Sequence, residues 1–250
     1  MKIIKYKKKA NGKYSVFLDD GREFVYYEDI ILKYNLLLKK EIDEESLIEI
    51  HNTNLEYDVY YVALKSINAR YKSIFELKQS LIKKEYPLPM IDKAIEKLIQ
   101  QKYLDDRSFA KSYIYTQMNT TMHGPNRIRR DLMQKKVDSA IIDDELSVYT
   151  EEIQKEKIDK LVQSAIKKNH TIGGVILKQK VVNDLKLQGF DSSVISSVVL
   201  NVHFPVDASI AKKEYDKLYN KYSKKYEGYE LKHIIHEKMF QKGLLYEEDE

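Results

Sequence analysis

Apolar residues recur along the chain in one pattern, in which a first apolar residue is followed by a second four positions later and a third five positions after that. The pattern occurs four times, at Leu77/Leu81/Tyr86, Ile128/Leu132/Val137, Val181/Leu185/Phe190 and Ile235/Met239/Leu244. Successive copies begin 51, 53 and 54 residues apart. A period of this length indicates a repeat architecture, in which small units bury their apolar faces against their neighbours.

Three further apolar columns follow in the first three copies. Given copy by copy, their residues are Ile91/Ile95/Leu98, Ile142/Leu146/Tyr149 and Ile195/Val199/Val202. Steps of four and three residues are typical of one face of an α-helix. The pattern therefore predicts units of three helices, and we expect the fourth unit to be degenerate because the sequence ends before a third helix.

The first 27 residues alternate between apolar and polar side chains, as strands do. Asn11-Gly12 and Asp20-Gly21 interrupt this alternation with residue pairs that favour tight hairpin turns. We expect a three-stranded antiparallel meander with strands at about 2–9, 13–19 and 22–27. Two short helices should cover it, one opened by Glu28 and the other capped by Asp43.

From about Tyr57 onward the pattern is helical, with predicted helix starts at Ser73, Asp105 and Pro125. The predicted fold class is mainly α, with tandem three-helix-bundle repeats in a curved, elongated solenoid that follow the small β-meander and its short helices. We expect an N-terminal region at 1–56 and repeats at 57–103, 104–150, 151–204 and 205–250.

Composition excludes several classes of protein. The chain has no cysteine, so disulfides, thiolate metal sites and cysteine nucleophiles are excluded. Met1 to Lys9 lack the apolar core of a signal peptide, and no apolar run approaches the roughly 18 residues of a membrane span. We expect a cytoplasmic protein that makes no membrane contact.

Basic residues are concentrated in the second helix of the early repeats, although the net charge of the chain is only +4. Residues 124–136 carry five basic residues and one acidic residue, and residues 65–84 carry six and one. A repeated basic stripe suits a long anionic partner such as a filament or a strand of phosphates. The candidate partner-binding residues are Lys72, Lys78, Lys84, Arg127, Arg129, Arg130, Lys135 and Lys136. The alternative interpretation is that these side chains form ordinary solvated helix faces.

Helical periodicity predicts where the basic side chains of residues 124–136 point. If Ile128 and Leu132 face the core, Arg127 and Arg130 should point outward, with Arg129 on one flank. Lys78 occupies the position that matches Arg129 in the preceding repeat. This match favours a binding role.

Other chemistry-bearing residues have simpler structural interpretations. Asp105 and Asp106 stand at a predicted helix start, where a cap explains them better than acid–base catalysis. His233 and His236 lack a third ligand and are expected to be a surface pair. The tyrosines of the last repeat, together with Tyr103 and Tyr113, have spacings typical of core packing. We expect no catalytic residue, metal or cofactor, because no phosphate-binding loop, nucleophile elbow or HExxH motif is present.

One set of motifs resembles a known family. The string Tyr103-Leu104-Asp105-Asp106 is followed by Phe109-Ala110, and then by Gly124-Pro125 leading into Ile128 and Leu132. In this combination, and in the three-helix repeat, the chain resembles the RecX family of recombination regulators over most of its length. It departs from the family's usual Lys-Gly-hydrophobic string after the second helix, which reads Lys84-Glu85-Tyr86 and Lys135-Lys136-Val137 here.

The resemblance implies a protein that is not an enzyme and that binds the RecA recombinase filament on single-stranded DNA. Family members look like curved arrays that lie in the groove of the filament and interfere with its activity. We therefore expect a monomeric regulator that contacts single-stranded DNA directly or through the filament and inhibits recombination. The alternatives are a helical-repeat scaffold for protein partners and a stand-alone DNA-binding protein.

Overall fold

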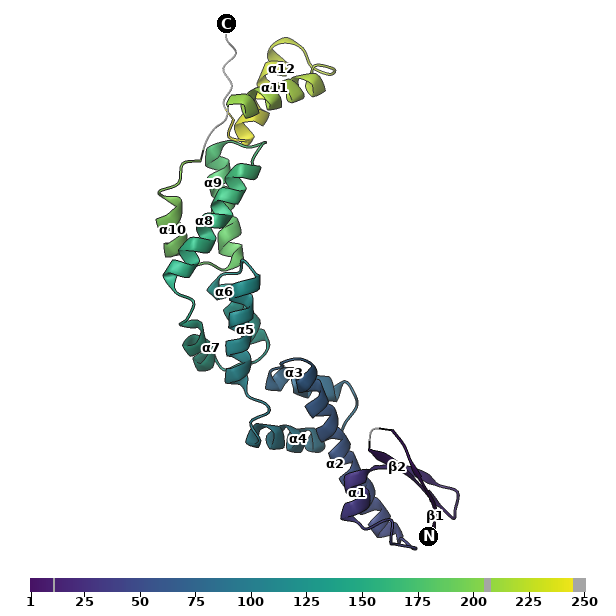
Figure 1. Cartoon of the computed structure of the whole chain (residues 1–250). Coiled ribbons are helices and arrows are strands. Elements are labelled where there is room, and N and C mark those ends of the chain that lie inside the picture. The colour runs from purple at the N-terminus through teal and green to yellow at the C-terminus, as the bar shows by residue number, and fades with distance from the viewer. Residues whose placement is uncertain (11, 205–207, 245–250) are drawn as a thin grey trace. The chain divides into compact units, whose positions relative to one another are not determined.

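The computed structural model describes residues 1–10, 12–204 and 208–244 (Figure 1). In this part of the chain there are twelve α-helices and one three-stranded sheet. The described residues form two compact units. The first comprises Met1–Ala110 and Lys135–Asp138, and the second comprises Lys111–Gln134 and the described residues from Ser139 onward. The prediction of a mainly α fold with a small meander is confirmed.

The meander has its expected order and register. Strands β1 (Ile3–Lys8), β2 (Lys13–Leu18) and β3 (Glu23–Tyr27) are antiparallel neighbours in the order β1-β2-β3. Val16 pairs with Phe24 and Tyr14 with Tyr26, so these residues share one face of the sheet. The turn before β3 contains Gly21 at a φ of 88°, a left-handed conformation that glycine adopts without strain. Asn11, in the other predicted turn, lies outside the described residues.

Helices cover one face of this sheet. Helix α1 (Glu28–Lys33) directs Ile30 and Ile31 into a core that also holds Val16, Leu18 and Tyr26. The start of α2 (Glu44–Ala69) closes this core with Leu47 and Ile50. The Asp43 side chain caps α2 by accepting a hydrogen bond of 2.7 Å from the Ser46 N–H, as predicted.

Helix α2 is continuous across the expected boundary between residues 56 and 57. Its first half packs in the meander core, whereas Val59 and Ala63 in its second half belong to the core of the first repeat. The two separate helices expected over this stretch are therefore one. The physical reason is that residues 51–58 contain no glycine or proline to end the helix, and each half is held by its own core.

The first repeat continues with α3 (Ile74–Ile82) and α4 (Leu88–Gln100). The Ser73 hydroxyl accepts from the Glu76 N–H at 3.1 Å, and the Glu76 carboxylate accepts from the Ser73 N–H at 3.2 Å. This reciprocal capping box fixes the start of α3 and confirms the predicted cap.

The remaining helices follow the predicted three-helix order. They are α5 (Asp106–Thr120), α6 (Pro125–Gln134), α7 (Ser139–Leu146), α8 (Glu151–Lys168), α9 (Gly174–Gln188), α10 (Ser192–Val199), α11 (Ala208–Tyr222) and α12 (Gly228–Gln241). Residues 205–207 and 245–250 of the expected fourth repeat lie outside the described residues. Its described part is the pair α11 and α12, whose core includes Leu218, Leu231 and Ile235.

The repeated apolar columns are the cores of the repeats. The first two columns are fully buried in all four copies, and their members are Leu77, Leu81, Ile128, Leu132, Val181, Leu185, Ile235 and Met239. Four residues after the second column, the backbone is left-handed in every copy. The residues there are Glu85, Lys136, Gly189 and Gly243, with φ values of 63°, 58°, 89° and 66°. The copies without glycine therefore keep the backbone turn that glycine makes elsewhere.

That left-handed turn is also where consecutive repeats meet. The Gly124 N–H, at the start of α6, donates at 2.8 Å to the carbonyl of Gln188, the last residue of α9. The Gly173 N–H, at the start of α9, donates to the carbonyl of Lys242 after α12 at 2.7 Å. In the first unit, the Ser73 hydroxyl donates to the carbonyl of Lys135 at 3.0 Å. At the starts of α6 and α9 a backbone N–H is thus satisfied by a carbonyl from the following repeat, whereas at the start of α3 it is the Ser73 hydroxyl that binds such a carbonyl.

In the described ranges, none of the helices combines the length and the apolar character needed to cross a bilayer.

Candidate partner-binding surface

The structure divides the eight candidate cations into two groups. Five of them contact a neighbouring side chain, and these are Lys72, Lys78, Arg127, Arg129 and Lys135. The other three are exposed and form no ion pair with a described residue, and these are Lys84, Arg130 and Lys136. This difference separates side chains that help to hold the fold from side chains that are available to a partner.

Lys78 and Arg129 make the same ion pair in successive repeats. Lys78 on α3 binds Asp92 on α4, with 2.6 Å between Nζ and Oδ1. Arg129 on α6 binds Asp143 on α7. The matching positions thus have a structural explanation, since each cation joins the second helix of a repeat to the third. The signal was present in the sequence, because Asp92 and Asp143 both directly follow the first column of the third helix.

Arg127 does not point outward, and that prediction is wrong. The residue is half-buried, and its guanidinium donates to Gln188 Oε1 at 3.3 Å. The turn at Gly189 packs against the Arg127 backbone so closely that a Cβ on Gly189 would lie 2.3 Å from the Arg127 nitrogen. The start of α6 is therefore covered by the next repeat, which periodicity within one helix cannot show.

Lys135 is held at the start of α3. Its ammonium lies 2.6 Å from Glu76 Oε1 and 6.0 Å from the centre of the Phe109 ring. Burial opposes ionisation of Glu76, but the hydrogen bonds from Lys135 and the Ser73 N–H outweigh burial and lower the pKa of this carboxyl group. Lys72 is likewise engaged, because its Nζ donates to the Ser66 hydroxyl at 2.6 Å.

Arg130 and Lys136 remain exposed on and just after α6, and Lys84 is exposed just after α3. Lys136 follows the last residue of α6 and is in the left-handed conformation, so its position is set by the turn and not by the helix. On α6 itself, Arg127 contacts the α9 turn, Arg129 contacts α7 and Arg130 faces solvent. The three arginines therefore share a helix without sharing a face.

Asp105 and Asp106 have structural roles. Asp105 caps α5, since its carboxylate accepts from the Ser108 N–H at 2.8 Å. Asp106 accepts from the Ile74 N–H at 2.9 Å, and burial raises the pKa of its carboxyl group. The predicted cap is confirmed for Asp105, and Asp106 connects the start of α5 to the start of α3.

The predictions for the histidine pair and for Tyr113 agree with the structure, whereas the prediction for Tyr103 does not. His233 and His236 are exposed, as expected, and no group of three potential metal ligands occurs within the described ranges. Tyr113 is half-buried and its hydroxyl donates to Asp131 at 3.2 Å. Tyr103 does not pack in a core and is 60% exposed, which contradicts the expectation for this residue. It follows the end of α4, where the neighbouring Leu104, and not Tyr103, is buried in the repeat core.

The tyrosines of the last repeat divide by position. Tyr215, Tyr222 and Tyr226 pack against the core between α11 and α12. Tyr219 and Tyr229 are exposed, so they do not belong to the predicted core stripe.

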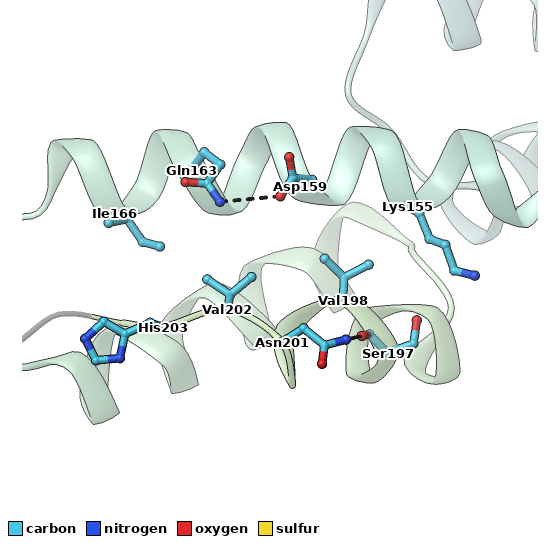
Figure 2. A pocket seen from close by; sticks show the side chains of 9 residues that line it. All are labelled: Lys155, Asp159, Gln163, Ile166, Ser197, Val198, Asn201, Val202 and His203. Atoms are coloured by element: carbon cyan, nitrogen blue, oxygen red, sulfur yellow. Dashed lines mark hydrogen bonds between the residues drawn. The ribbon is translucent and has the colours of Figure 1, made fainter.

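A groove of about 800 Å³ lies between α8 and the end of α10 (Figure 2). Figure 2 shows Ile166, Gln163 and Asp159 on α8 along one side of the groove and Val198 and Val202 along the other, with Lys155 and His203 toward opposite ends. The polar lining groups make local hydrogen bonds, since Asp159 accepts from the Gln163 amide at 3.4 Å and the Asn201 amide donates to the Ser197 carbonyl at 3.0 Å. The groove is an ordinary crevice between two packed helices.

The chain is similar to known proteins along nearly its whole length. Residues 60–98 match a family model described as the first three-helix domain of RecX, and residues 105–146 match the second three-helix domain. The regulatory protein RecX of Bacillus subtilis (strain 168) is 31% identical over 245 residues, which cover 96% of this chain and 92% of that protein. RecX of Oceanobacillus iheyensis is 27% identical, with 98% of this chain and 93% of that protein covered.

Solved structures agree with the sequence relatives. A crystal structure of regulatory protein RecX matches with a TM-score of 0.66 and 28% identity, over 79% of this chain and 98% of that one. RecX from Lactobacillus salivarius matches with a TM-score of 0.56 and 26% identity, over 59% of this chain and 96% of that one. The repeated three-helix units, the left-handed turns that join them and this extensive identity lead to one conclusion: the chain belongs to the RecX family of regulatory proteins.

Proposed function

We propose that the protein binds the RecA recombinase filament on single-stranded DNA and restrains its recombination and DNA-repair activity. Membership of a regulatory family supports the regulatory role, and the resemblance in the repeat motifs supports the filament as its target. In this proposal the protein acts by binding and not by catalysis, and it needs no cofactor.

The observation that carries the proposal is that three of the eight candidate cations, Lys84, Arg130 and Lys136, are exposed and form no ion pair with a described residue. Each follows or lies on the second helix of a repeat. A cation that has no internal partner can bind a phosphate or a carboxylate without breaking a contact of the fold. We therefore assign these three residues to the proposed contact, Lys84 and Lys136 in the first unit and Arg130 in the second.

Lys78 and Arg129 support the same contact at its edge. Both are partly exposed beside their aspartates. A guanidinium has five N–H donors, so Arg129 can bind Asp143 and a partner oxygen at the same time. Arg127, Lys72 and Lys135 contribute by holding the starts of α6 and α3, and we assign them this supporting role.

Binding to a recombinase-coated filament tests the proposal. Arg130→Glu combined with Lys136→Glu should weaken binding to the filament by about tenfold or more, because two attractive contacts become repulsive. The matched control is Lys39→Glu combined with Lys40→Glu, which changes the charge equally at exposed positions of the N-terminal region. The control should bind like the unmodified protein, and both variants should keep its unfolding temperature.

Three binding arms separate this function from its alternatives. The arms are the filament, naked single-stranded DNA and the recombinase alone. Direct contact with about four single-strand phosphates would give a log–log salt slope near −3. Filament binding that exceeds both other arms supports the proposal, and equal binding to naked DNA would identify a stand-alone DNA-binding protein. Absence of binding in all three arms would contradict the proposal.

A further inference from the structure

A second cationic region lies in the first unit, in a cleft of about 490 Å³ between the end of α2, the end of α4 and the start of α5. Two connecting segments form its walls, one from Arg70 to Lys72 and the other from Lys102 to Asp105. In both segments a tyrosine stands directly beside a basic residue. The strings are Arg70-Tyr71-Lys72 and Lys102-Tyr103. We call this feature the Tyr71/Tyr103 cleft.

The two tyrosines expose their rings to solvent. Tyr71 is 69% exposed and Tyr103 is 60% exposed. Neither hydroxyl makes a hydrogen bond with another described residue. A large aromatic side chain that contributes neither to a core nor to a hydrogen bond is available as a binding surface, and here two such rings line one cleft.

The charges around these rings are predominantly positive. Arg70 is 68% exposed and has one long ion pair, with 3.7 Å between its Nη2 and Glu76 Oε1. Lys102 is exposed and forms no ion pair with a described residue. Lys72 adds a third cation, whose Nζ is bound to the neutral Ser66 hydroxyl.

Asp105 is the one carboxylate among the residues that line the cleft, and it is already engaged. Its oxygens accept from the N–H groups of Ser108 and Arg107 at the start of α5. The hydrogen bond from the Ser108 side chain, together with these two, lowers the pKa of Asp105. Its charge is thus directed to the helix start, and the cleft presents an excess of positive charge.

We infer that the Tyr71/Tyr103 cleft binds bases of single-stranded nucleic acid, with the tyrosine rings stacking on bases and Arg70 and Lys102 contacting the flanking phosphates. Proteins that bind single strands combine flat exposed rings with cations, because every base has a π-face and every phosphodiester linkage carries a negative charge. An acidic peptide would engage the cations but would not need two exposed rings. The inference deepens the proposed function by locating a direct DNA contact, and its test uses naked DNA so that the two can fail separately.

The absence of tryptophan from the chain allows a direct test of stacking. Tyr71→Trp and Tyr103→Trp each place a single tryptophan in the cleft, and Tyr115→Trp places one on α5 at a residue that is 71% exposed and does not line the cleft. Titration with an oligothymidylate of about ten nucleotides should quench the fluorescence of the two cleft variants and leave that of Tyr115→Trp nearly unchanged.

Affinity measurements on variants without the tyrosine rings test the same contact. Tyr71→Ala combined with Tyr103→Ala should weaken oligothymidylate binding by about tenfold per ring. Tyr71→Phe combined with Tyr103→Phe keeps the rings and should bind like the unmodified protein. Tyr115→Ala combined with Tyr229→Ala removes two rings elsewhere that are more exposed than those of the cleft, and should have little effect. An abasic oligomer of equal length, which keeps the phosphates, should bind the unmodified protein and the double alanine variant alike.

Two results would overturn the inference. One is equal quenching, or none, at positions 71, 103 and 115. The other is unchanged DNA affinity in the double alanine variant together with weakened binding to DNA-free recombinase, which would make the cleft a protein-docking surface. Because the DNA titrations contain no recombinase, their outcome does not depend on whether the protein restrains the filament.

Discussion

The backbone N–H of Gly124 donates a hydrogen bond of 2.8 Å to the carbonyl of Gln188, and this contact joins the start of one repeat's second helix to the end of the next repeat's second helix. A Cβ on Gly124 would lie 2.4 Å from the Gly189 carbonyl, so the contact requires the close approach that glycine permits. The same relationship links Gly173 to Lys242. The repeats of the second unit are thus connected through backbone groups as well as through apolar packing.

Gly189→Ala should destabilise the protein more than Gly21→Ala. The two glycines have nearly equal φ values, 89° and 88°, so the conformational strain of an alanine is matched. A Cβ at Gly21 meets no atom within 4 Å, whereas a Cβ at Gly189 would collide with the Arg127 backbone. We expect an additional loss of about 1–3 kcal/mol in the free energy of unfolding for Gly189→Ala, measured by urea denaturation. Equal losses would show that the turn can move away from α6 without effect.

Glu85→Gly should stabilise the protein. Glu85 has a φ of 63°, a conformation that costs a residue with a Cβ about 1–2 kcal/mol. Glycine removes this strain but loses more backbone entropy on folding, so we expect a net gain of about 0.5–1 kcal/mol in the free energy of unfolding. Glu85→Ala is the control, because alanine removes the same charge and keeps the Cβ. A gain of the same size in both variants would assign the effect to charge instead of backbone conformation.

Much of the fold could be predicted because its determinants are local. Alternation, turn dipeptides and steps of four and three residues identify the meander, and the apolar columns identify the repeat cores. The caps at Asp43, Ser73 and Asp105 depend on a side chain and an N–H three residues away. The continuity of α2 differs from the prediction because the apolar positions of its two halves belong to two separate cores, although the absence of glycine and proline from residues 51–58 was a local signal for one helix.

The environments of the cations could be predicted only in part, because they depend on contacts between distant segments. Arg127 is covered by a turn from the following repeat, and Lys135 is held by Glu76 of the preceding one. Neither contact can be predicted from the periodicity of a single helix. The Lys78–Asp92 and Arg129–Asp143 pairs are different, since both partners recur at equal spacing and could have been recognised by comparing two columns at once.

Asp58→Asn should lower stability at neutral pH. The Asp58 carboxylate accepts hydrogen bonds of 2.6 Å from the Tyr27 and Tyr86 hydroxyls and one of 3.2 Å from Lys13. Burial opposes its ionisation, but these donors outweigh burial and lower the pKa of Asp58. Loss of the charged acceptor should reduce the free energy of unfolding by about 1–3 kcal/mol.

The pH dependence of this effect has a definite sign. A carboxyl group with a lowered pKa in the folded state stabilises the protein above the ordinary aspartate pKa of about 4, and this stabilisation is lost as the pH falls through the folded-state pKa. The difference between the unmodified protein and Asp58→Asn should therefore shrink in acid. Asp184→Asn, at an exposed residue, is the control and should show little difference at any pH. A difference between the unmodified protein and Asp58→Asn that is constant with pH would contradict this role of the carboxylate.

Asp143→Ala should strengthen binding to the filament. Removal of this carboxylate releases Arg129 from its ion pair on the partly exposed side of α6 and makes the region more positive. Because the pair is partly solvated, the free energy of unfolding should fall by only about 0.2–1 kcal/mol. Asp184→Ala makes the same change in net charge at an exposed residue of α9 and controls for it. Binding that is weaker than in the control would show that Asp143 positions Arg129 for the partner.

The rate of single-stranded-DNA-dependent ATP hydrolysis by the RecA recombinase tests the central claim most directly. Stoichiometric amounts of the unmodified protein should slow this hydrolysis, and Arg130→Glu combined with Lys136→Glu should restore it, whereas Lys39→Glu combined with Lys40→Glu should inhibit as strongly as the unmodified protein. A hydrolysis rate that does not change when the unmodified protein is added, or equal inhibition by both double variants, would contradict the account.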